Sequence, residues 1–208
     1  MSNTLDLNIS LIGLNKYENA AMVTMKTFFC QFSKLEVLHV NDVTSDEMIK
    51  SLTTSNPSLR ELYLNDFHED NDESRILSDK SIVSLSENCP NLEYISIPVY
   101  AKKGVLEKFV FSCPNLKHIE LEGSVIEDEA FGQLSEHVRA LEHLQMNYAP
   151  NISIEGIKRL VSSAECLKKL AVYWPGQGES GKLVKKEEFY KLLEEYPKVD
   201  IFIYFLVD

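Results

Sequence analysis

A six-residue frame of apolar residues recurs through the chain and constrains its fold more than any other feature. The frame has apolar residues at its first, fourth and sixth positions, and it reads LEVLHV at 35–40, LRELYL at 59–64, LEYISI at 92–97, LKHIEL at 116–121, LEHLQM at 141–146 and LKKLAV at 167–172. Successive copies start 24, 33, 24, 25 and 26 residues apart, and a degenerate copy, VDIFIY at 199–204, follows after 32. One such unit cannot bury its apolar side alone, so the copies predict a stack with one continuous core.

Stretches with helical spacing of apolar residues lie between the copies, and prolines at 90, 114 and 197 follow their ends. The apolar positions are Ile82 and Leu85; Phe131, Leu134 and Val138; Ile154, Ile157, Leu160 and Val161; and Phe189, Leu192 and Leu193. Ser78 and Ser153 are the predicted caps of two of these helices. Each unit is therefore predicted to be a strand, a turn and a helix, and the alternating LDLNISL at 5–11 predicts a further strand before them.

Most of these intervals fall in the range of 20–29 residues that is typical of leucine-rich repeats. The two long intervals contain insertions, at 66–74 and 174–182. We therefore expect an α/β leucine-rich-repeat solenoid, or horseshoe, with a parallel concave sheet and helices on the convex side. It would form a single domain over residues 1–208 with about seven to eight repeats.

The segments ILSDKSIVSLSENCPNLEYISI at 76–97 and CPNLKHIEL at 113–121 resemble the cysteine-containing leucine-rich repeat of F-box/LRR proteins. The resemblance implies that Cys89 and Cys113 are buried packing residues. It also implies that the chain recognises substrates for a ubiquitin ligase. The resemblance does not extend to an F-box, so it leaves open whether a Skp1-like adaptor is a partner.

Residues of a strand alternate between its two sides, so the polar residues of each frame predict an exposed, concave face. Tyrosine and histidine supply contact area while neighbouring polar groups supply specificity, which favours binding of another protein. A merely solvated sheet is the alternative. The predicted partner-binding residues of this face are His39, Tyr63, Asn65, Tyr94, Ser96, His118, Glu120, His143 and Gln145.

The last strand carries apolar residues on both sides. Its frame predicts that Phe202, Tyr204 and Leu206 lie in the core, whereas Ile201, Ile203 and Phe205 are exposed. Tyr173, Trp174 and Phe205 would then belong to an apolar patch that binds a partner. The alternative is that the insertion at 174–182 folds back and caps the open edge of the terminal repeat.

The balance of charge limits the classes of partner. The chain has 21 lysines and arginines against 32 aspartates and glutamates, a net charge of −11, which argues against nucleic acid and against an anionic membrane as ligands. No secretory signal or membrane-spanning stretch is evident, and the four cysteines are not clustered. The sequence therefore predicts a cytoplasmic or nuclear protein with reduced thiols.

Several local motifs suggest chemistry but lack a required residue. GQGESGK at 176–182 resembles a phosphate-binding loop, yet Leu183 stands where Ser or Thr would bind magnesium, which favours a flexible insertion. The acidic residues at 66–73 lack the glycine and final glutamate of a calcium loop. His118 and His143 share a column beside Glu120, but no third ligand at zinc-site spacing supports a metal centre.

No catalytic motif accompanies these segments, so we expect no enzyme activity, no cofactor and no metal site. The favoured function is a non-catalytic protein-interaction module. Two alternatives remain. The first is a structural assembly factor that docks through its apolar C-terminal edge, and the second is a regulator of a small GTPase.

Overall fold

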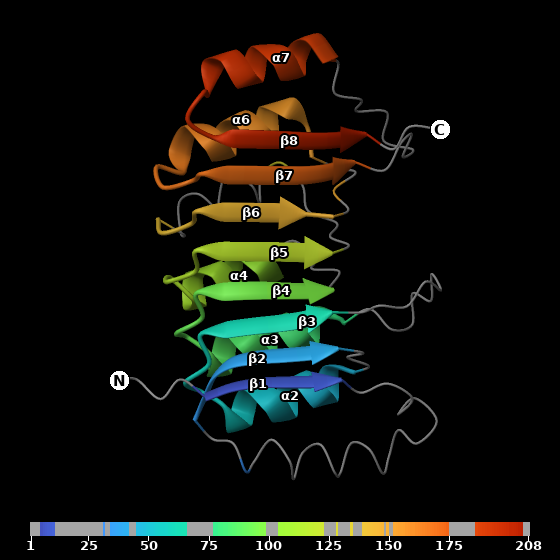
Figure 1. Ribbon diagram of the computed structural model, residues 1–208, viewed down its shortest axis with the longest axis vertical. Helices are drawn as coiled ribbons and strands as arrows, with labels where there is room; N and C mark the ends of the chain where they lie inside the picture. Colours follow the sequence, from blue (N-terminus) through green and yellow to red (C-terminus); the bar gives the residue numbers. More distant parts are fainter. Residues whose placement is uncertain are drawn as a thin grey trace.

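The computed structural model describes residues 5–10, 31, 34–41, 45–65, 77–98, 104–122, 128, 134, 139–147, 149, 152–174 and 186–205. Within them, eight strands form one parallel sheet in chain order (Figure 1). The strands are β1 (Leu5–Ser10), β2 (Leu35–Asn41), β3 (Glu61–Asn65), β4 (Tyr94–Pro98), β5 (His118–Glu122), β6 (His143–Met146), β7 (Lys169–Trp174) and β8 (Asp200–Phe205). The described helices are α2 (Asp46–Ser55), α3 (Asp79–Asn88), α4 (Val105–Ser112), α6 (Ile154–Ser163) and α7 (Lys186–Glu195).

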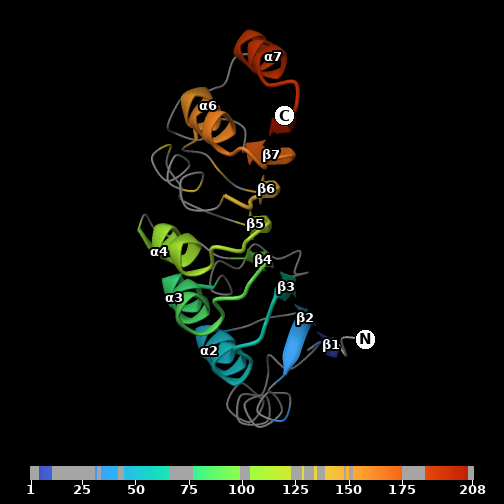
Figure 2. The same ribbon diagram turned by 90° about the vertical axis from the view of Figure 1, so that its left-hand side faces the viewer.

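All of the described helices lie on one side of the sheet (Figure 2). Each of them follows a strand in the chain and precedes the next parallel strand. Parallel neighbours need such a crossover because a tight hairpin can join only antiparallel strands. The predicted unit of strand, turn and helix is thus confirmed for the described parts of the chain.

The apolar positions of the six good frames point toward the helices. The fourth frame position is in register from strand to strand, through the pairs Leu38–Leu62, Leu62–Ile95, Ile95–Ile119, Ile119–Leu144 and Leu144–Leu170. The leading leucines are also buried, with exposed fractions of 0–4%. The core therefore lies between the sheet and the helices, and the opposite face of the sheet is free of described helices.

Serine residues are the N-caps of α2, α3 and α6, and aspartates bind the cap residues of α3 and α6. Ser78 and Ser153 are the N-caps of α3 and α6, as predicted. The carboxylate of Asp46, in the first turn of α2, accepts hydrogen bonds from the Ser78 amide at 2.9 Å and from the Ser78 and Ser81 hydroxyls at 2.6 Å. Burial raises the pKa of Asp46, but these hydrogen bonds together outweigh burial and bring that pKa below its usual value.

The same arrangement recurs at the other end of the sheet. Asp128 accepts hydrogen bonds from the Ser153 amide at 2.6 Å and from the Ser153 hydroxyl. Asp46 therefore joins the start of α2 to the start of α3, and Asp128 binds the cap at the start of α6.

The cysteines implied to be packing residues end their helices and are fully buried. Cys89 and Cys113 are the C-caps of α3 and α4, each with an exposed fraction of 0%. The Cys113 thiol lies 3.4 Å from the carbonyl oxygen of Cys89, and the Cys89 thiol lies 3.7 Å from that of Asn56. Burial raises the pKa of both thiols to about 12, so both stay protonated at neutral pH.

The frame predicted for the last strand was wrong by one residue. Ile201 pairs with Leu170 and is 5% exposed, whereas Phe202 and Tyr204 are 41% and 45% exposed. Val199 follows the turn before β8, as Leu167 follows the turn before β7. The next core residue in β8 is Ile201, two positions after Val199, whereas in β7 Leu170 comes three positions after Leu167. A shift of one residue moves every side chain of a strand to its other face. The predicted insertion at 66–74 lies outside the described residues, as does the predicted insertion at 174–182 after its first residue, Trp174, which ends β7.

Candidate functional site

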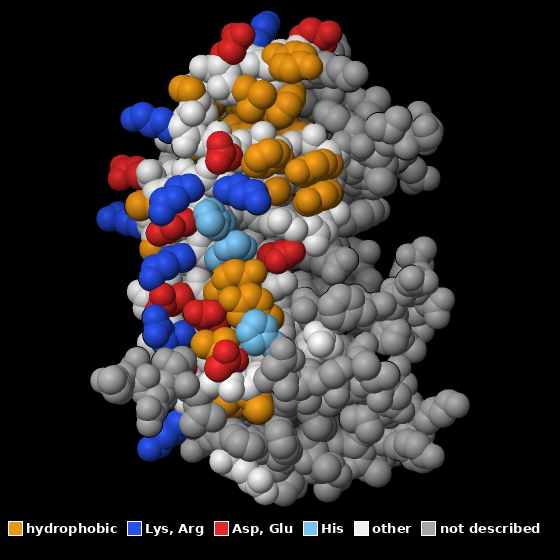
Figure 3. Space-filling model, in the orientation of Figure 1, with side chains coloured by type: hydrophobic (Ala, Val, Ile, Leu, Met, Phe, Trp, Pro, Cys, Tyr) orange, Lys and Arg blue, Asp and Glu red, His pale blue; other side chains and the backbone are white. Residues whose placement is uncertain are grey.

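The side of the sheet without described helices presents the polar positions of the frames; we call it the open face (Figure 3). The strand register places these residues in columns, as predicted. The first column is Val37, Glu61, Tyr94, His118, His143, Lys169 and Asp200, and the second is His39, Tyr63, Ser96, Glu120, Gln145, Ala171 and Phe202.

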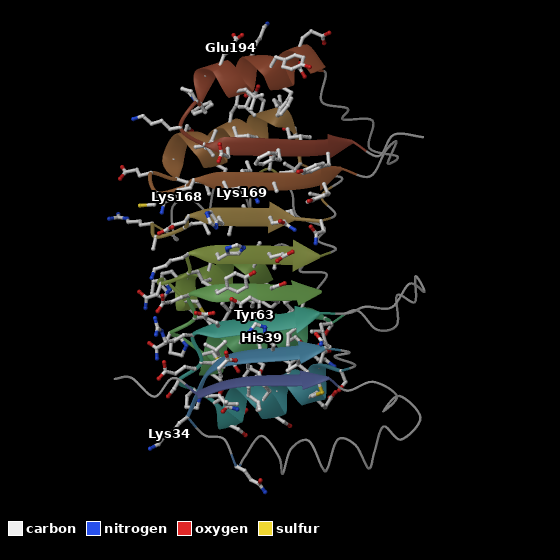
Figure 4. The ribbon with its side chains drawn as sticks, viewed as in Figure 1. Lys34, His39, Tyr63, Lys168, Lys169 and Glu194 are labelled. Atoms are coloured by element: carbon white, nitrogen blue, oxygen red, sulfur yellow. The ribbon has the colours of Figure 1, made fainter. Side chains whose placement is uncertain are left out.

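A continuous stack of five rings crosses the open face from β2 to β6; we call it the ring stack. His39 stacks on Tyr63, and the two are labelled in Figure 4. Tyr63 in turn stacks on Tyr94, and the ring centroids of both pairs are 4.1 Å apart. Tyr94 stacks on His118 at 4.2 Å, and His118 meets His143 edge to face at 5.0 Å. The stack passes from the second column to the first between Tyr63 and Tyr94, because the rings of these long side chains reach diagonal neighbours.

Hydrogen bonds hold polar groups in the ring stack and beside it. The Tyr63 hydroxyl donates to Glu61 Oε2 at 2.9 Å, and Gln145 Nε2 donates to Glu120 Oε1 at 2.8 Å. Burial, followed by the negative charge of Glu120, raises the pKa of Tyr94 to about 12. Burial, followed by the hydrogen bond to Glu61, also raises the pKa of Tyr63, so both tyrosines stay neutral and the rings form a preorganised, amphipathic surface.

The two histidines of the stack form a hydrogen-bonded pair. Their Nδ1 atoms are 3.2 Å apart. Burial, together with the neighbouring His143 and Lys169, lowers the pKa of His118 to about 4. Among the described residues, no three histidine, cysteine or carboxylate side chains gather in a group that could hold a metal ion.

Acidification is expected to destabilise the fold through His118. Its pKa is about 4 in the folded chain and 6.5 for the unperturbed group, so the unfolded state binds this proton first as the pH falls. The stabilisation is complete above pH 6.5 and is lost as the pH falls from there toward 4. Urea unfolding at pH 7.5 and pH 5.0 measures this loss, about 1–2 kcal/mol from His118.

His118→Phe is the control for this prediction, because phenylalanine keeps a ring in the stack and cannot titrate. The variant should lose about 1–2 kcal/mol less than the wild type between the two pH values. Equal losses in the two proteins would show that His118 does not carry the pH dependence.

A second aromatic group lies at the C-terminal end of the open face. Tyr173 and Tyr204 stack with centroids 4.4 Å apart, and Phe202 lies 6.3 Å from Tyr204. Because β8 is shifted by one residue, the exposed side chains are Phe202 and Tyr204. The frame had predicted exposure of Ile201, Ile203 and Phe205 instead. The side chains of Trp174 and Phe205, predicted for this patch, lie outside the described residues.

Charged residues of alternating sign follow the edge of the sheet where the strands begin, and several of these neighbours form ion pairs; we call the row the edge ladder. Its residues come directly after the leading apolar residue of each good frame, in the order Glu36, Arg60, Glu93, Lys117, Glu142 and Lys168. Glu93 accepts hydrogen bonds from Arg60 Nε at 2.7 Å and from Lys117 Nζ at 2.6 Å, which lower its pKa. Lys168 pairs with Glu142 at 2.5 Å. Sequence reasoning missed this ladder, although the alternating sign at one frame position was its signal.

The structure brings most of the predicted site residues together on the open face. Ser96 lies on this face, but its side chain is 9% exposed because larger neighbours surround it. The side chain of Asn65 lies outside the described residues, as do the acidic segment 66–73 and the GQGESGK segment. In the part of the chain that the structure describes, no helix is long and apolar enough to span a bilayer.

No protein-family model matches this chain. Over 74 residues the chain is 31% identical to an F-box protein of Arabidopsis thaliana. The match covers 33% of this chain and 15% of that protein, so the chain spans only a small part of that relative's length. Over about a third of its residues, the chain is thus similar to part of an F-box protein.

Proposed function

We propose that the chain is a leucine-rich-repeat solenoid that captures another protein on its open face, without catalysing a reaction. The ring stack carries this proposal. Five rings over five neighbouring strands form a rigid surface, so little side-chain entropy is lost when a partner covers it. Tyr63 and Tyr94 are partly exposed, and tyrosine is among the side chains most enriched at the energetic centre of protein interfaces.

Two further observations support this function. Repeat units arranged side by side create one extended surface, which is the usual binding site of solenoids. The similarity to an F-box protein adds a specific version, in which the chain recognises substrates for ubiquitin ligation. Co-purification with a Skp1-like adaptor would support that version.

Removal of the two central rings tests the proposal. The Tyr63→Ala, Tyr94→Ala double variant should keep its circular dichroism spectrum and lose ten- to hundredfold in partner affinity, as is typical of aromatic hot spots. The measurement is quantitative capture of the partner from a cross-linked extract of the source cell.

A matched control removes two aromatics from helices. Phe111 on α4 and Tyr190 on α7 are 70% and 62% exposed, and they project from the helices instead of the open face. The Phe111→Ala, Tyr190→Ala variant should capture the partner as well as the wild type does. Equal capture by the ring-stack variant and the wild type would contradict the proposal.

The exposed pair of Phe202 and Tyr204 on β8 favours a second candidate, a structural assembly factor that docks through this end of the sheet. An outermost strand with exposed rings can add a neighbour along its free edge. Permanent docking predicts that the isolated protein self-associates in sizing chromatography and that Phe202→Ser with Tyr204→Ser makes it monomeric. A monomeric wild-type protein would speak against this candidate.

A further inference from the structure

Carboxylates of the open face differ from those of the edge ladder in their partners. In the ladder, Glu93 and Glu142 are paired with lysine or arginine at 2.5–2.6 Å. On the open face, Glu61 and Glu120 accept hydrogen bonds from the neutral Tyr63 hydroxyl and Gln145 amide instead. Within the described residues, neither of these two carboxylates has a lysine or arginine partner.

The open face is negatively charged from β1 to β6. Its described side chains there include the acids Asp6, Glu61 and Glu120 but neither lysine nor arginine. His118 adds no positive charge at neutral pH, because burial lowers its pKa. Among the described side chains of this face, the first lysine along the sheet is Lys169 on β7, whose ammonium lies 5.6 Å from the ring centroid of Phe202.

The ring stack limits the directions from which a cation can approach its two tyrosines. Tyr63 has His39 on one face and Tyr94 on the other, both at 4.1 Å, and Tyr94 likewise lies between Tyr63 and His118. A cation therefore cannot lie over the faces of these two tyrosines. It can reach their outer rims, where the carboxylates of Glu61 and Glu120 lie.

Because the carboxylates of the open face, unlike those of the edge ladder, have no lysine or arginine partner within the described residues, we infer that the open face binds a basic peptide segment of its partner. Arginine or lysine side chains of this segment pair with Glu61 and Glu120, and its backbone crosses the ring stack. The inference rests on the proposed function, for which it specifies the chemistry of the partner. The cations of the segment supply the counter-charges that these carboxylates lack within the described chain. The alternating ladder at the edge is already neutralised and does not compete for them.

The spacing of the two carboxylates defines a probe. Glu61 and Glu120 are two strands and one column apart, a Cα separation of roughly 12 Å from standard sheet spacings. In an extended peptide, side chains at positions i and i+4 point the same way and lie about 13 Å apart. A 12-residue fluorescent peptide with two arginines four positions apart, in an otherwise neutral sequence, fits this spacing.

Fluorescence anisotropy of this peptide with the full chain, at about 0.15 M salt, tests the inference. The Glu61→Gln, Glu120→Gln variant should bind the peptide at least fivefold more weakly than the wild type. Glu87 on α3 and Glu194 on α7 are exposed acids of the helices, so Glu87→Gln with Glu194→Gln makes the same change in net charge as a control. That control should bind as the wild type does.

Two results would overturn the inference. One is equal weakening by both charge variants, which would mean that only net charge matters. The other is unchanged binding when both arginines of the peptide are replaced by glutamine.

Capture of the natural partner separates this inference from the proposed function. If Tyr63→Ala with Tyr94→Ala abolishes capture and Glu61→Gln with Glu120→Gln leaves it intact, the open face is the binding site but the partner segment is not basic. If both variants weaken capture, both proposals are supported. If neither does, the proposed function itself fails.

Discussion

Leu38→Ala is expected to lower the free energy of unfolding by about 3 kcal/mol, within the range found for fully buried leucines. Leu38 occupies the fourth position of its frame, is 0% exposed and pairs with Leu7 and Leu62 on the two neighbouring strands. Truncation leaves a cavity that a rigid stack of strands cannot close. Urea unfolding measured by circular dichroism gives this free energy.

The adjacent residue provides the control for this prediction. Val37 is also apolar, but it lies on the open face and is partly exposed. Val37→Ala should therefore cost less than about 1 kcal/mol, because little buried surface is lost. Similar losses for both variants would contradict the assignment of inward and outward positions in the frame.

Gly156→Ala is expected to cost about 1–3 kcal/mol, as overpacking of a well-ordered site does. Gly156 lies in the first turn of α6, and a Cβ atom there would meet the carboxylate of Asp128, with its Cγ only 2.8 Å away. The Asp128 main chain is also close, with its Cα at 3.1 Å. The substitution therefore displaces the carboxylate that binds the N-cap residue Ser153.

A double-mutant cycle with Asp128→Ala checks the cause. The aspartate variant alone should lose about 1 kcal/mol through the weakened cap. Once the carboxylate is gone, Gly156→Ala should cost much less than it does in the wild type, so the two losses should not add. Additive losses would mean that the glycine is required for another reason.

The repeated frame predicted the strands and their register because its signal depends on burial, which every unit must satisfy. Sequence reasoning placed His39, Tyr63 and His118 on the exposed side, and the structure places them there because their neighbours Leu38, Leu62 and Ile119 fill the core. It failed at β8, where one residue fewer precedes Ile201. A frame with apolar residues on both sides does not reveal such a deletion, since either phase buries apolar atoms.

Two helices were not singled out from the sequence. In α4, apolar residues occur all round the helix, from buried Phe109 to 70% exposed Phe111, so the periodicity is weak. Its N-cap is Gly104, with a φ of 84°, which gives no side-chain capping signal. In α2, Met48, Ile49 and Leu52 make only a short apolar stripe. Packing against neighbouring units, rather than local propensity, determines both helices.

The ring stack itself could not be foreseen from the columns. Tyr63 and Tyr94 belong to different columns, and their contact depends on side-chain rotamers that bring diagonal neighbours together. The same holds for the hydrogen bond from Tyr63 to Glu61, which determines the place of the carboxylate. Strand periodicity identifies the face that a residue occupies, whereas these contacts decide what the face can bind.

Site-specific photo-cross-linking is the most direct test of the claim that the open face binds the partner. A photoreactive phenylalanine derivative can replace Tyr94 in the ring stack or, as the control, Phe111 on α4, since both are aromatic. We expect a cross-link to the partner from position 94 and none from position 111. A cross-link from position 111 alone would place the partner on the helices and contradict binding at the open face.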